Sequence, residues 1–300
     1  KGDWVMKKYI VFDIGGTEIK YSLMNEYSEI LTNDVFKNEN LNGSELLKKI
    51  KNIIIKNKEE HNVVGAAFSI PGFVNSKTGL IEDGGAIPDF NGVNIKDIIE
   101  KDCQIETWAE NDANCVALAE KWTGNAKDSK DFLCLTIGTG IGGSIFINNE
   151  LYRGSNYMAG EFGYMLINGF DEDKYYKDQI LSRIMGLKGF LHDVSLEIGE
   201  SVTGQDVFDK KIFGKEEILE AHIERFYKNF AIAIFNLIYI FNPEKILIGG
   251  AISRRDDIID KLKENISKIE ERANTKVTIE QCKHYNDSGK IGALYHFLNR

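Results

Sequence analysis

The sequence predicts an α/β fold made of two related domains with a cleft between them. The first observation is an internal repeat: residues 9–25 (YIVFDIGGTEIKYSLMN) and 132–148 (FLCLTIGTGIGGSIFIN) both read as an apolar strand, a glycine turn and a second apolar strand. The second is that helical segments follow each copy, so that strands and helices alternate in both halves. The third is the length of 300 residues, near which single cores tend to split into domains.

Both halves supply the further elements that this fold needs. The predicted strands outside the repeats cover residues 63–70, 104–109 and 245–248. The predicted helices cover residues 44–60, a segment that opens after Asn111 and closes near 122–124, residues 217–241, and the C-terminal segment. We therefore expect a first domain at residues 6–121 and a second at residues 122–289. Residues 290–300 should form a helix that packs back on the first domain.

The composition excludes several classes of protein. The 37 basic and 46 acidic side chains give a formal net charge of −9 with no basic block, so a nucleic-acid partner has no evident source of attraction. The longest apolar stretch, residues 230–241, is about a dozen residues, short of the roughly 18 that span a bilayer, and predicts a buried helix. The N-terminal segment KGDWVM lacks the features of a secretory signal, and Met6 is a candidate natural start. We expect a cytoplasmic protein that binds no membrane.

The cysteines predict reduced thiols rather than a disulfide set or a metal site. No short spacing and no adjacent histidine is found among Cys103, Cys115, Cys134 and Cys282. So few cysteines in a chain of this length indicate cytosolic thiols that lie mostly in the core. The sequence shows no zinc site.

The glycine turns of the two repeats are candidate phosphate-binding hairpins. They lie at residues 13–17, DIGGT, and residues 136–143, TIGTGIGG. Backbone N–H groups approach an anion closely where side chains are missing, although a Gly-Gly turn is also ordinary hairpin chemistry. The second turn is neither a Walker A loop nor a convincing dinucleotide motif, because the strand-like segment SIFIN follows it. Two such hairpins converging on one cleft predict a cradle for a phosphate chain.

We expect specific groups of these hairpins to hold that chain. Magnesium prefers carboxylate and water oxygens, so Asp13 could hold Mg²⁺, directly or through water. The expected phosphate donors are the backbone amides of Gly15, Gly16, Thr17, Gly138, Thr139 and Gly140.

The segment Glu110-Asn111-Asp112 joins a predicted strand end to a helix start. An Asp or Asn here is an ordinary helix N-cap. The carboxyl end of a strand also faces the cleft of an α/β domain. In that cleft Asp112 could accept the proton of a substrate hydroxyl as a general base.

Two further glycine-flanked segments are candidates for ligand contact. Glu161, in GEFGY at 160–164, either occupies a solvent-facing turn or hydrogen-bonds sugar hydroxyls. The segment LIGGA at 247–251 ends a strand, and the bare backbone of Gly249 and Gly250 would suit a flat base.

Together these motifs resemble the ROK family, which comprises bacterial sugar kinases and related repressors with an actin-like (ribonuclease H-like), hexokinase-type ATPase fold of two domains. DIGGT is similar to that family's first phosphate loop, LTIGTGIGG at 135–143 to its second, and ILIGGAIS at 246–253 to its adenosine segment. END at 110–112 is similar to its catalytic segment, which implies that Asp112 activates a sugar hydroxyl. The resemblance also implies ATP and Mg²⁺ as cofactors, a homodimer, and a sugar site that contains Gly72, Asn91, Asn111, Asp112 and Glu161.

Two departures limit this resemblance. Tyr164 stands where most members have a histidine, and residues 166–190 contain none of the cysteines that hold a structural zinc in the family. We therefore predict no zinc. The family's second sugar-binding glutamate belongs to the lost cluster, and counting back four residues from Ser182 puts Asp178 in its place. Tyr175 or Gln179 is the competing candidate.

The zinc-less β-glucoside kinases are the most similar group within the family. The similar segments are ENDANC at 110–115, AGEFGYML at 159–166, SVTG at 201–204 and GALYHF at 292–297. That group implies ATP-dependent phosphorylation of the 6-hydroxyl of a β-glucoside such as cellobiose. N-acetylmannosamine kinases share the same segments and are the alternative, together with glucokinase-type hexose kinases.

Two other classes of function are less favoured. A repressor of the family would carry an N-terminal helix-turn-helix, for which the first strand, near Tyr9, leaves no room. A catalytically silent sugar sensor would use the same pocket, but the intact hairpins and Asp112 argue against it.

Overall fold

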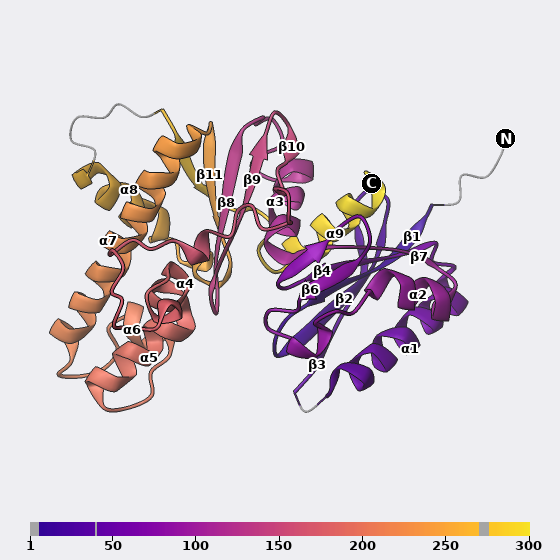
Figure 1. Ribbon diagram of the computed structural model, residues 1–300, viewed down its shortest axis with the longest axis horizontal. Helices are drawn as coiled ribbons and strands as arrows, with labels where there is room; N and C mark the ends of the chain where they lie inside the picture. Colours follow the sequence, from indigo (N-terminus) through magenta and orange to yellow (C-terminus); the bar gives the residue numbers. More distant parts are fainter. Residues whose placement is uncertain (1–5, 40, 270–275) are drawn as a thin grey trace. The chain divides into compact units, whose positions relative to one another are not determined.

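The computed structural model describes residues 6–39, 41–269 and 276–300, which form two compact units (Figure 1). The residues that precede the candidate start at Met6 lie outside the described part. The first unit contains the chain up to Lys127, the short segment Arg153–Ala159 and the C-terminal segment Asn286–Arg300. The second unit contains Asp128–Tyr152 and Gly160–Tyr285.

The first unit is built on a mixed five-stranded sheet in the order β3-β2-β1-β4-β7. Its strands are β1 (Lys8–Ile14), β2 (Glu18–Asn25), β3 (Ile30–Lys37), β4 (Gly65–Ile70) and β7 (Glu106–Asn111). Strands β1 and β2 form an antiparallel hairpin, and β4 and β7 run parallel to β1. A small ribbon of β5 (Phe73–Asn75) and β6 (Leu80–Asp83) follows β4. The carboxyl ends of β1, β4 and β7 therefore lie at one edge of the sheet.

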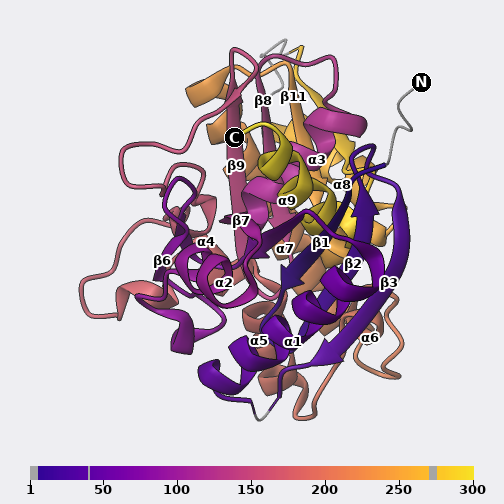
Figure 2. The ribbon, with the colours of Figure 1, turned by 90° about the vertical axis from the view of Figure 1, so that its right-hand side faces the viewer.

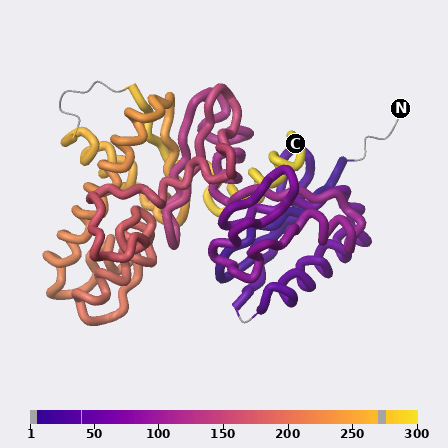
Figure 3. The backbone as a smooth tube through the Cα atoms, in the orientation of Figure 1, coloured from indigo at the N-terminus to yellow at the C-terminus, as the bar shows by residue number. Residues whose placement is uncertain are grey.

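Helices cover both faces of this sheet, which explains the continuous apolar run of β1. Ile10 and Phe12 enter a core on one face with α1 (Gly43–His61) and α2 (Ile95–Cys103). Tyr9 and Val11 enter a second core with α3 (Asp112–Thr123) and α9 (Ser288–Leu298). Figures 1 and 2 both show α9 beside α3, and the tube in Figure 3 shows the end of the chain returning to the unit in which it began. The α9 helix is thus part of the first unit's core.

The second unit repeats this arrangement around the strand order β10-β9-β8-β11-β12. Its strands are β8 (Phe132–Ile137), β9 (Ile141–Ile147), β10 (Glu150–Leu151), β11 (Lys245–Gly249) and β12 (Thr278–Gln281). Its helices are α4 (Leu181–Met185), α5 (Leu187–Ile198), α6 (Gly204–Phe208), α7 (Glu216–Phe241) and α8 (Ile258–Ile269). Strands β8 and β9 form a hairpin, and β11 runs parallel to β8 as β4 runs parallel to β1. The internal repeat is therefore a repeat of structure, and the predicted α/β class is confirmed.

The apolar stretch at 230–241 lies in α7, whose inner face is buried. None of the helices in the described ranges has the length and hydropathy to cross a bilayer. All four cysteines are buried, as expected for thiols that lie in the core.

The sequence did not predict strand β3. Most of its side chains are exposed, because β3 lies at the edge of the sheet. Without a buried face, the strand lacks the alternation on which a prediction from sequence depends.

Candidate active site

The first hairpin, between Ile14 and Ile19, presents backbone N–H groups that have no partner in the described part of the chain. The side chain of Asn38 donates from Nδ2 to the Gly15 carbonyl at 3.0 Å, and its backbone N–H donates to the Thr17 carbonyl at 3.1 Å. The N–H of Gly15 closes the turn on the Glu18 carbonyl at 3.0 Å. The N–H groups of Gly16 and Thr17 have no hydrogen-bond partner within the described residues. Both residues are exposed, so an anion can reach these donors.

The second hairpin, between Ile137 and Ile141, is held in an analogous way by the start of α5. The N–H of Leu187 donates to the Gly138 carbonyl at 2.8 Å, and the N–H of Lys188 donates to the Thr139 carbonyl at 3.2 Å. In a trans peptide the N–H points opposite to the carbonyl. The N–H groups of Thr139 and Gly140 therefore point away from α5, and no partner for them occurs in the described part of the chain.

These contacts correct one expectation about the hairpins. The N–H of Gly15 is bound to Glu18, and the N–H of Gly138 donates to the Gly140 carbonyl at 3.0 Å. Neither is free to bind phosphate, because each closes its own turn. The remaining donors are the N–H groups of Gly16, Thr17, Thr139 and Gly140.

Asp13, near the end of β1, lies against β4 and the start of α9. Its Oδ1 accepts a hydrogen bond from Ser69 Oγ at 2.7 Å. A Cβ on Gly289 would overlap this same carboxylate oxygen, so α9 can approach only because residue 289 is glycine. Burial raises the pKa of Asp13, against the smaller effects of the Ser69 hydrogen bond and of two lysine charges. Within the described residues Oδ2 has no hydrogen-bond partner.

Asp112 is the first residue of α3, and its carboxylate is fixed through one oxygen. The N–H of Ala113 donates to Oδ1 at 2.8 Å, and Asn111 Nδ2 donates to the same atom at 3.1 Å. Burial, followed by the negative charge of Asp13, raises the pKa of Asp112 to about 6. The Asp112 side chain is nevertheless exposed to solvent, so a substrate can reach it. Oδ2 makes no hydrogen bond within the described residues and is available as an acceptor.

The other residues expected at a sugar site in the first unit lie on loops next to Asp112. Asn111 caps α3 by accepting from the Asn114 N–H at 3.0 Å, and its Nδ2 donates to the Gly72 carbonyl at 2.8 Å. Gly72 has φ +88°, and a Cβ there would overlap the Asp83 carbonyl. Asn91 accepts from the Gly84 N–H at 2.7 Å, so its carboxamide oxygen is already engaged while its NH₂ has no partner in the described ranges.

The remaining candidates for sugar contact belong to the second unit. Glu161 precedes the short 3₁₀ turn Phe162–Tyr164, and Asp178 ends the turn Tyr176–Asp178 with its side chain exposed. The carboxamide of Gln179 bonds to the backbone of Asp171 and Lys174 and thereby closes the loop between them. Gln179 is therefore a structural residue of this loop and not the replacement for the lost glutamate.

A pocket of about 950 Å³ opens beside Gly249 and Gly250 in the second unit. Gly250 has φ +82°, and a Cβ there would overlap the backbone of Ile137, so only glycine allows β11 and the second hairpin to approach this closely. Polar and apolar groups share the wall of the pocket, which includes Leu187, Gly204, Phe208, Ala251, Ile252 and Arg255. Leu187 lines this pocket and also donates its N–H to the Gly138 carbonyl, so the pocket lies next to the second hairpin.

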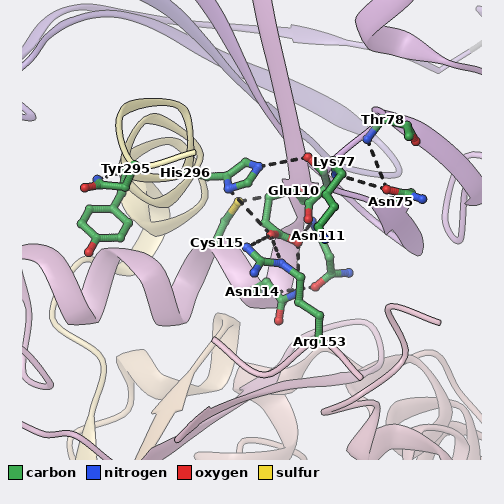
Figure 4. Close-up of polar contacts among 12 residues, drawn as sticks. Asn75, Lys77, Thr78, Glu110, Asn111, Asn114, Cys115, Arg153, Tyr295 and His296 are labelled. Carbon is green, nitrogen blue, oxygen red and sulfur yellow. Dashed lines mark hydrogen bonds and ion pairs between the residues drawn. The ribbon is translucent and has the colours of Figure 1, made fainter. Parts of the chain in front are cut away.

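Sequence reasoning missed three contributors to this site. Asn38 shapes the first hairpin, Gly289 packs on Asp13, and Arg153 binds Glu110, which precedes Asp112 by two residues (Figure 4). Each lies far along the chain from its partner, and no local pattern connects them. The described residues contain no group of three or more His, Cys, Asp or Glu side chains placed to hold a metal ion.

The chain was compared with known proteins. The model of the ROK family matches residues 9–300. A β-glucoside kinase of Listeria monocytogenes is 38% identical over 294 residues, which are 97% of each chain.

Two solved structures are also similar. One is a Listeria monocytogenes protein proposed to be an N-acetylmannosamine kinase, with a TM-score of 0.89 and 38% identity, covering 97% of this chain and 99% of the other. The other is a ROK family protein from Streptococcus pneumoniae in complex with sucrose, with a TM-score of 0.86 and 29% identity, covering 97% and 98%.

Proposed function

The chain belongs to the ROK family and is a sugar kinase, and we propose that it transfers the γ-phosphoryl group of ATP to the 6-hydroxyl of a β-glucoside such as cellobiose. The observation that carries the mechanism is Asp112: one carboxylate oxygen is fixed by two donors and the other is free. The choice of acceptor rests on the 38% identity to a β-glucoside kinase along nearly the whole chain.

In this proposal Asp112 is the general base. A pKa of about 6 leaves the carboxylate ionised near pH 7 yet basic enough to take a proton. Oδ2 accepts the proton of the sugar hydroxyl as the hydroxyl oxygen attacks the γ-phosphorus. The two hydrogen bonds to Oδ1 keep the carboxylate oriented during this step, so little reorganisation is needed.

The hairpins bind the phosphates of ATP through the four free N–H groups of Gly16, Thr17, Thr139 and Gly140. Fixed dipoles of this kind stabilise charge that develops during phosphoryl transfer. The residues present fit a magnesium ion at Asp13, since Oδ2 is without a partner in the described part and a carboxylate is a preferred ligand. Magnesium bound there would neutralise phosphate charge.

The remaining site residues bind the two substrates. We propose that Gly72, Asn91, Asn111 and Glu161 contact the sugar that Asp112 activates, and that Asp178 takes the place of the family's second glutamate. The adenine lies in the pocket beside Gly249 and Gly250. We further propose a cytoplasmic homodimer, which rests on the family resemblance alone.

The second candidate acceptor is N-acetylmannosamine, because a structural relative with 38% identity is proposed to be a kinase for that sugar. A coupled assay of ADP release would test both. Mg-ATP is supplied with cellobiose, gentiobiose, glucose, N-acetylmannosamine or N-acetylglucosamine, and kcat/KM is compared. A preference of about tenfold for the disaccharides, roughly 1.4 kcal/mol, supports the proposal. A preference for N-acetylmannosamine overturns it and assigns the second candidate.

A further inference from the structure

Behind the proposed base lies a buried carboxylate that the mechanism has not used. Glu110, the residue before Asn111 on β7, has no exposed surface. Its Oε1 accepts from the Asn111 N–H at 2.9 Å and from Asn114 Nδ2 at 3.0 Å. Its Oε2 accepts from Arg153 Nε at 2.8 Å and Nη2 at 2.6 Å (Figure 4). All four groups bound to this carboxylate are N–H donors.

Arg153 reaches Glu110 from a short arm, residues 153–159. The arm belongs to the first unit, although the residues on either side of it belong to the second. A hydrogen bond of 3.1 Å from the Ala159 N–H to the Arg153 carbonyl closes the arm into a loop. Glu161 follows the arm after a single glycine with φ +89°. The position of Glu161 therefore depends on where the arm is anchored.

We propose that Glu110 and Arg153 are positioning residues for the kinase reaction, which hold Asp112 on one side and the arm that leads to Glu161 on the other. The inference rests on the proposed function, in which Asp112 is the base and Glu161 a sugar ligand.

The connection to Asp112 runs through the first turn of α3. Glu110 fixes the backbone of Asn111 and the side chain of Asn114. The Asn111 side chain in turn bonds to Asp112 Oδ1, to the Gly72 carbonyl and to the Asn114 N–H. Asp112 thus lies on a turn that the Glu110 carboxylate holds at two points. A shift of about 1 Å in a catalytic group is enough to cost on the order of 10² in rate.

The chemistry of Glu110 and Arg153 limits which side chains could replace them. A glutamine at 110 would bring an NH₂ group against a set of donors, so it cannot replace the carboxylate. Without Arg153, Glu110 would be a buried carboxylate whose nearest cationic group among the described residues is His296. The His296 Nδ1 is 4.0 Å from Oε2, and burial lowers the pKa of this histidine. An apolar pair could fill the same volume, but it could not accept from Asn111 and Asn114.

The test compares Arg153→Ala and Glu110→Gln with Arg300→Ala. Arg300 is a matched control, because it forms an ion pair with Glu106 on the same strand, where both side chains are partly exposed. For Arg153→Ala and Glu110→Gln we expect kcat for sugar phosphorylation to fall by about tenfold or more. The Kd and stoichiometry of ATP binding should stay within twofold of wild type, and Arg300→Ala should match wild type throughout.

Two further measurements separate positioning from a general structural role. Millimolar guanidinium should restore part of the kcat of Arg153→Ala and none of that of Glu110→Gln, because only the first variant lacks a cation. The double variant should lose no more kcat than the worse single variant, since the two residues act as one unit. Should Glu110→Gln fail to fold, Arg153→Ala with guanidinium rescue still decides the question.

Several results would overturn the inference. One is a kcat within twofold of Arg300→Ala; another is a loss of kcat that matches a parallel loss of ATP-binding stoichiometry. Asp112→Asn is measured alongside as a reference. If that variant is inactive while Arg153→Ala and Glu110→Gln are active, only the positioning inference fails. If Asp112→Asn itself keeps full activity, the proposed base is wrong and the inference falls with it.

Discussion

The two glycine hairpins arise from one sequence repeat, yet different parts of the chain hold their carbonyls. In the first hairpin Asn38, just after β3, donates from its side chain to the Gly15 carbonyl and from its backbone N–H to the Thr17 carbonyl. In the second, the first two N–H groups of α5 do so. Helix α5 thereby satisfies two of the donors that every helix start leaves open. The comparison indicates that a phosphate-binding turn needs more than glycines. It also needs N–H donors from other parts of the chain, which bind the carbonyls of the turn and direct them away from the phosphate.

The hairpins also differ in charge. Asp13 in β1 pairs with Lys20 of β2, whereas the corresponding position in β8 is Thr136, which pairs with Gly142. The carboxylates proposed for metal binding and proton transfer, Asp13 and Asp112, both lie in the first unit. The second hairpin contributes amides alone.

The largest expected effect comes from Asp112, the proposed general base of the first unit. Asp112→Asn should lower kcat by roughly 10²–10⁴, the usual contribution of a general base, and leave the Kd for ATP nearly unchanged. Steady-state kinetics and equilibrium nucleotide binding would measure the two quantities. A variant with near-normal turnover would remove Asp112 from the mechanism and leave Asp13 as the only proposed difference in charge between the two hairpins.

Gly289→Ala should disrupt the packing of α9 against Asp13, beside the first hairpin. Its Cβ would overlap Asp13 Oδ1 and displace the carboxylate, which should cost on the order of 10² in kcat/KM and raise the Mg²⁺ concentration for half-maximal activity. Gly292→Ala, on the same helix as Gly289, is the control, because its Cβ would overlap the backbone of Cys115 in α3 instead of the Asp13 carboxylate. We expect that control to lower the thermal midpoint without changing the Mg²⁺ requirement. An equal Mg²⁺ requirement in both variants would contradict this account.

The pH dependence should report the closeness of the two carboxylates. Only ionised Asp112 accepts a proton, so kcat/KM should rise with pH through about 6, reach a plateau above, and fall about tenfold per unit below. The pH dependence of the folding stability has the opposite sign to that of kcat/KM. A carboxyl whose pKa is raised in the folded state loses its contribution as pH rises from its ordinary value of 3.8 through about 6. Asp112→Asn should therefore have a higher thermal midpoint than wild type at pH 8, and that difference should shrink toward pH 4. A difference independent of pH would mean that burial and Asp13 do not perturb Asp112.

The smallest effect is expected from Asn38→Ala, which frees the Gly15 carbonyl. Loss of one hydrogen bond of about 1 kcal/mol should raise the KM for ATP roughly fivefold and change kcat little. Asn57→Ala is the matched control, since Asn57 Nδ2 donates to the Ile53 carbonyl within α1, at a distance of 2.9 Å. If both variants have the same KM, the side chain of Asn38 does not shape the first hairpin.

The sequence predicted those parts of the molecule that local patterns encode. Both hairpins, helices α1, α3 and α7, and strands β4, β7 and β11 lie within a few residues of their expected positions. The partnerships were not predictable, because a hydrogen bond between Glu110 and Arg153, or between Asn38 and Gly15, leaves no periodic trace in one sequence. The glycine turns and the family resemblance assigned the N–H groups of Gly15 and Gly138 to phosphate. Their hydrogen bonds to Glu18 and Gly140 depend on the conformation of each turn, which the sequence does not show.

The place of α9 in the first unit has a consequence for synthesis of the protein. Strand β1 leaves the ribosome long before α9, but Tyr9 and Val11 pack against Ile291, Leu294 and Phe297, and the Phe297 ring occupies the space beside Gly65. The second unit is encoded entirely before this helix. The second unit can therefore fold during translation, while one apolar face of the first sheet stays open until α9 emerges, and an apolar face left open in this way exposes the nascent chain to aggregation.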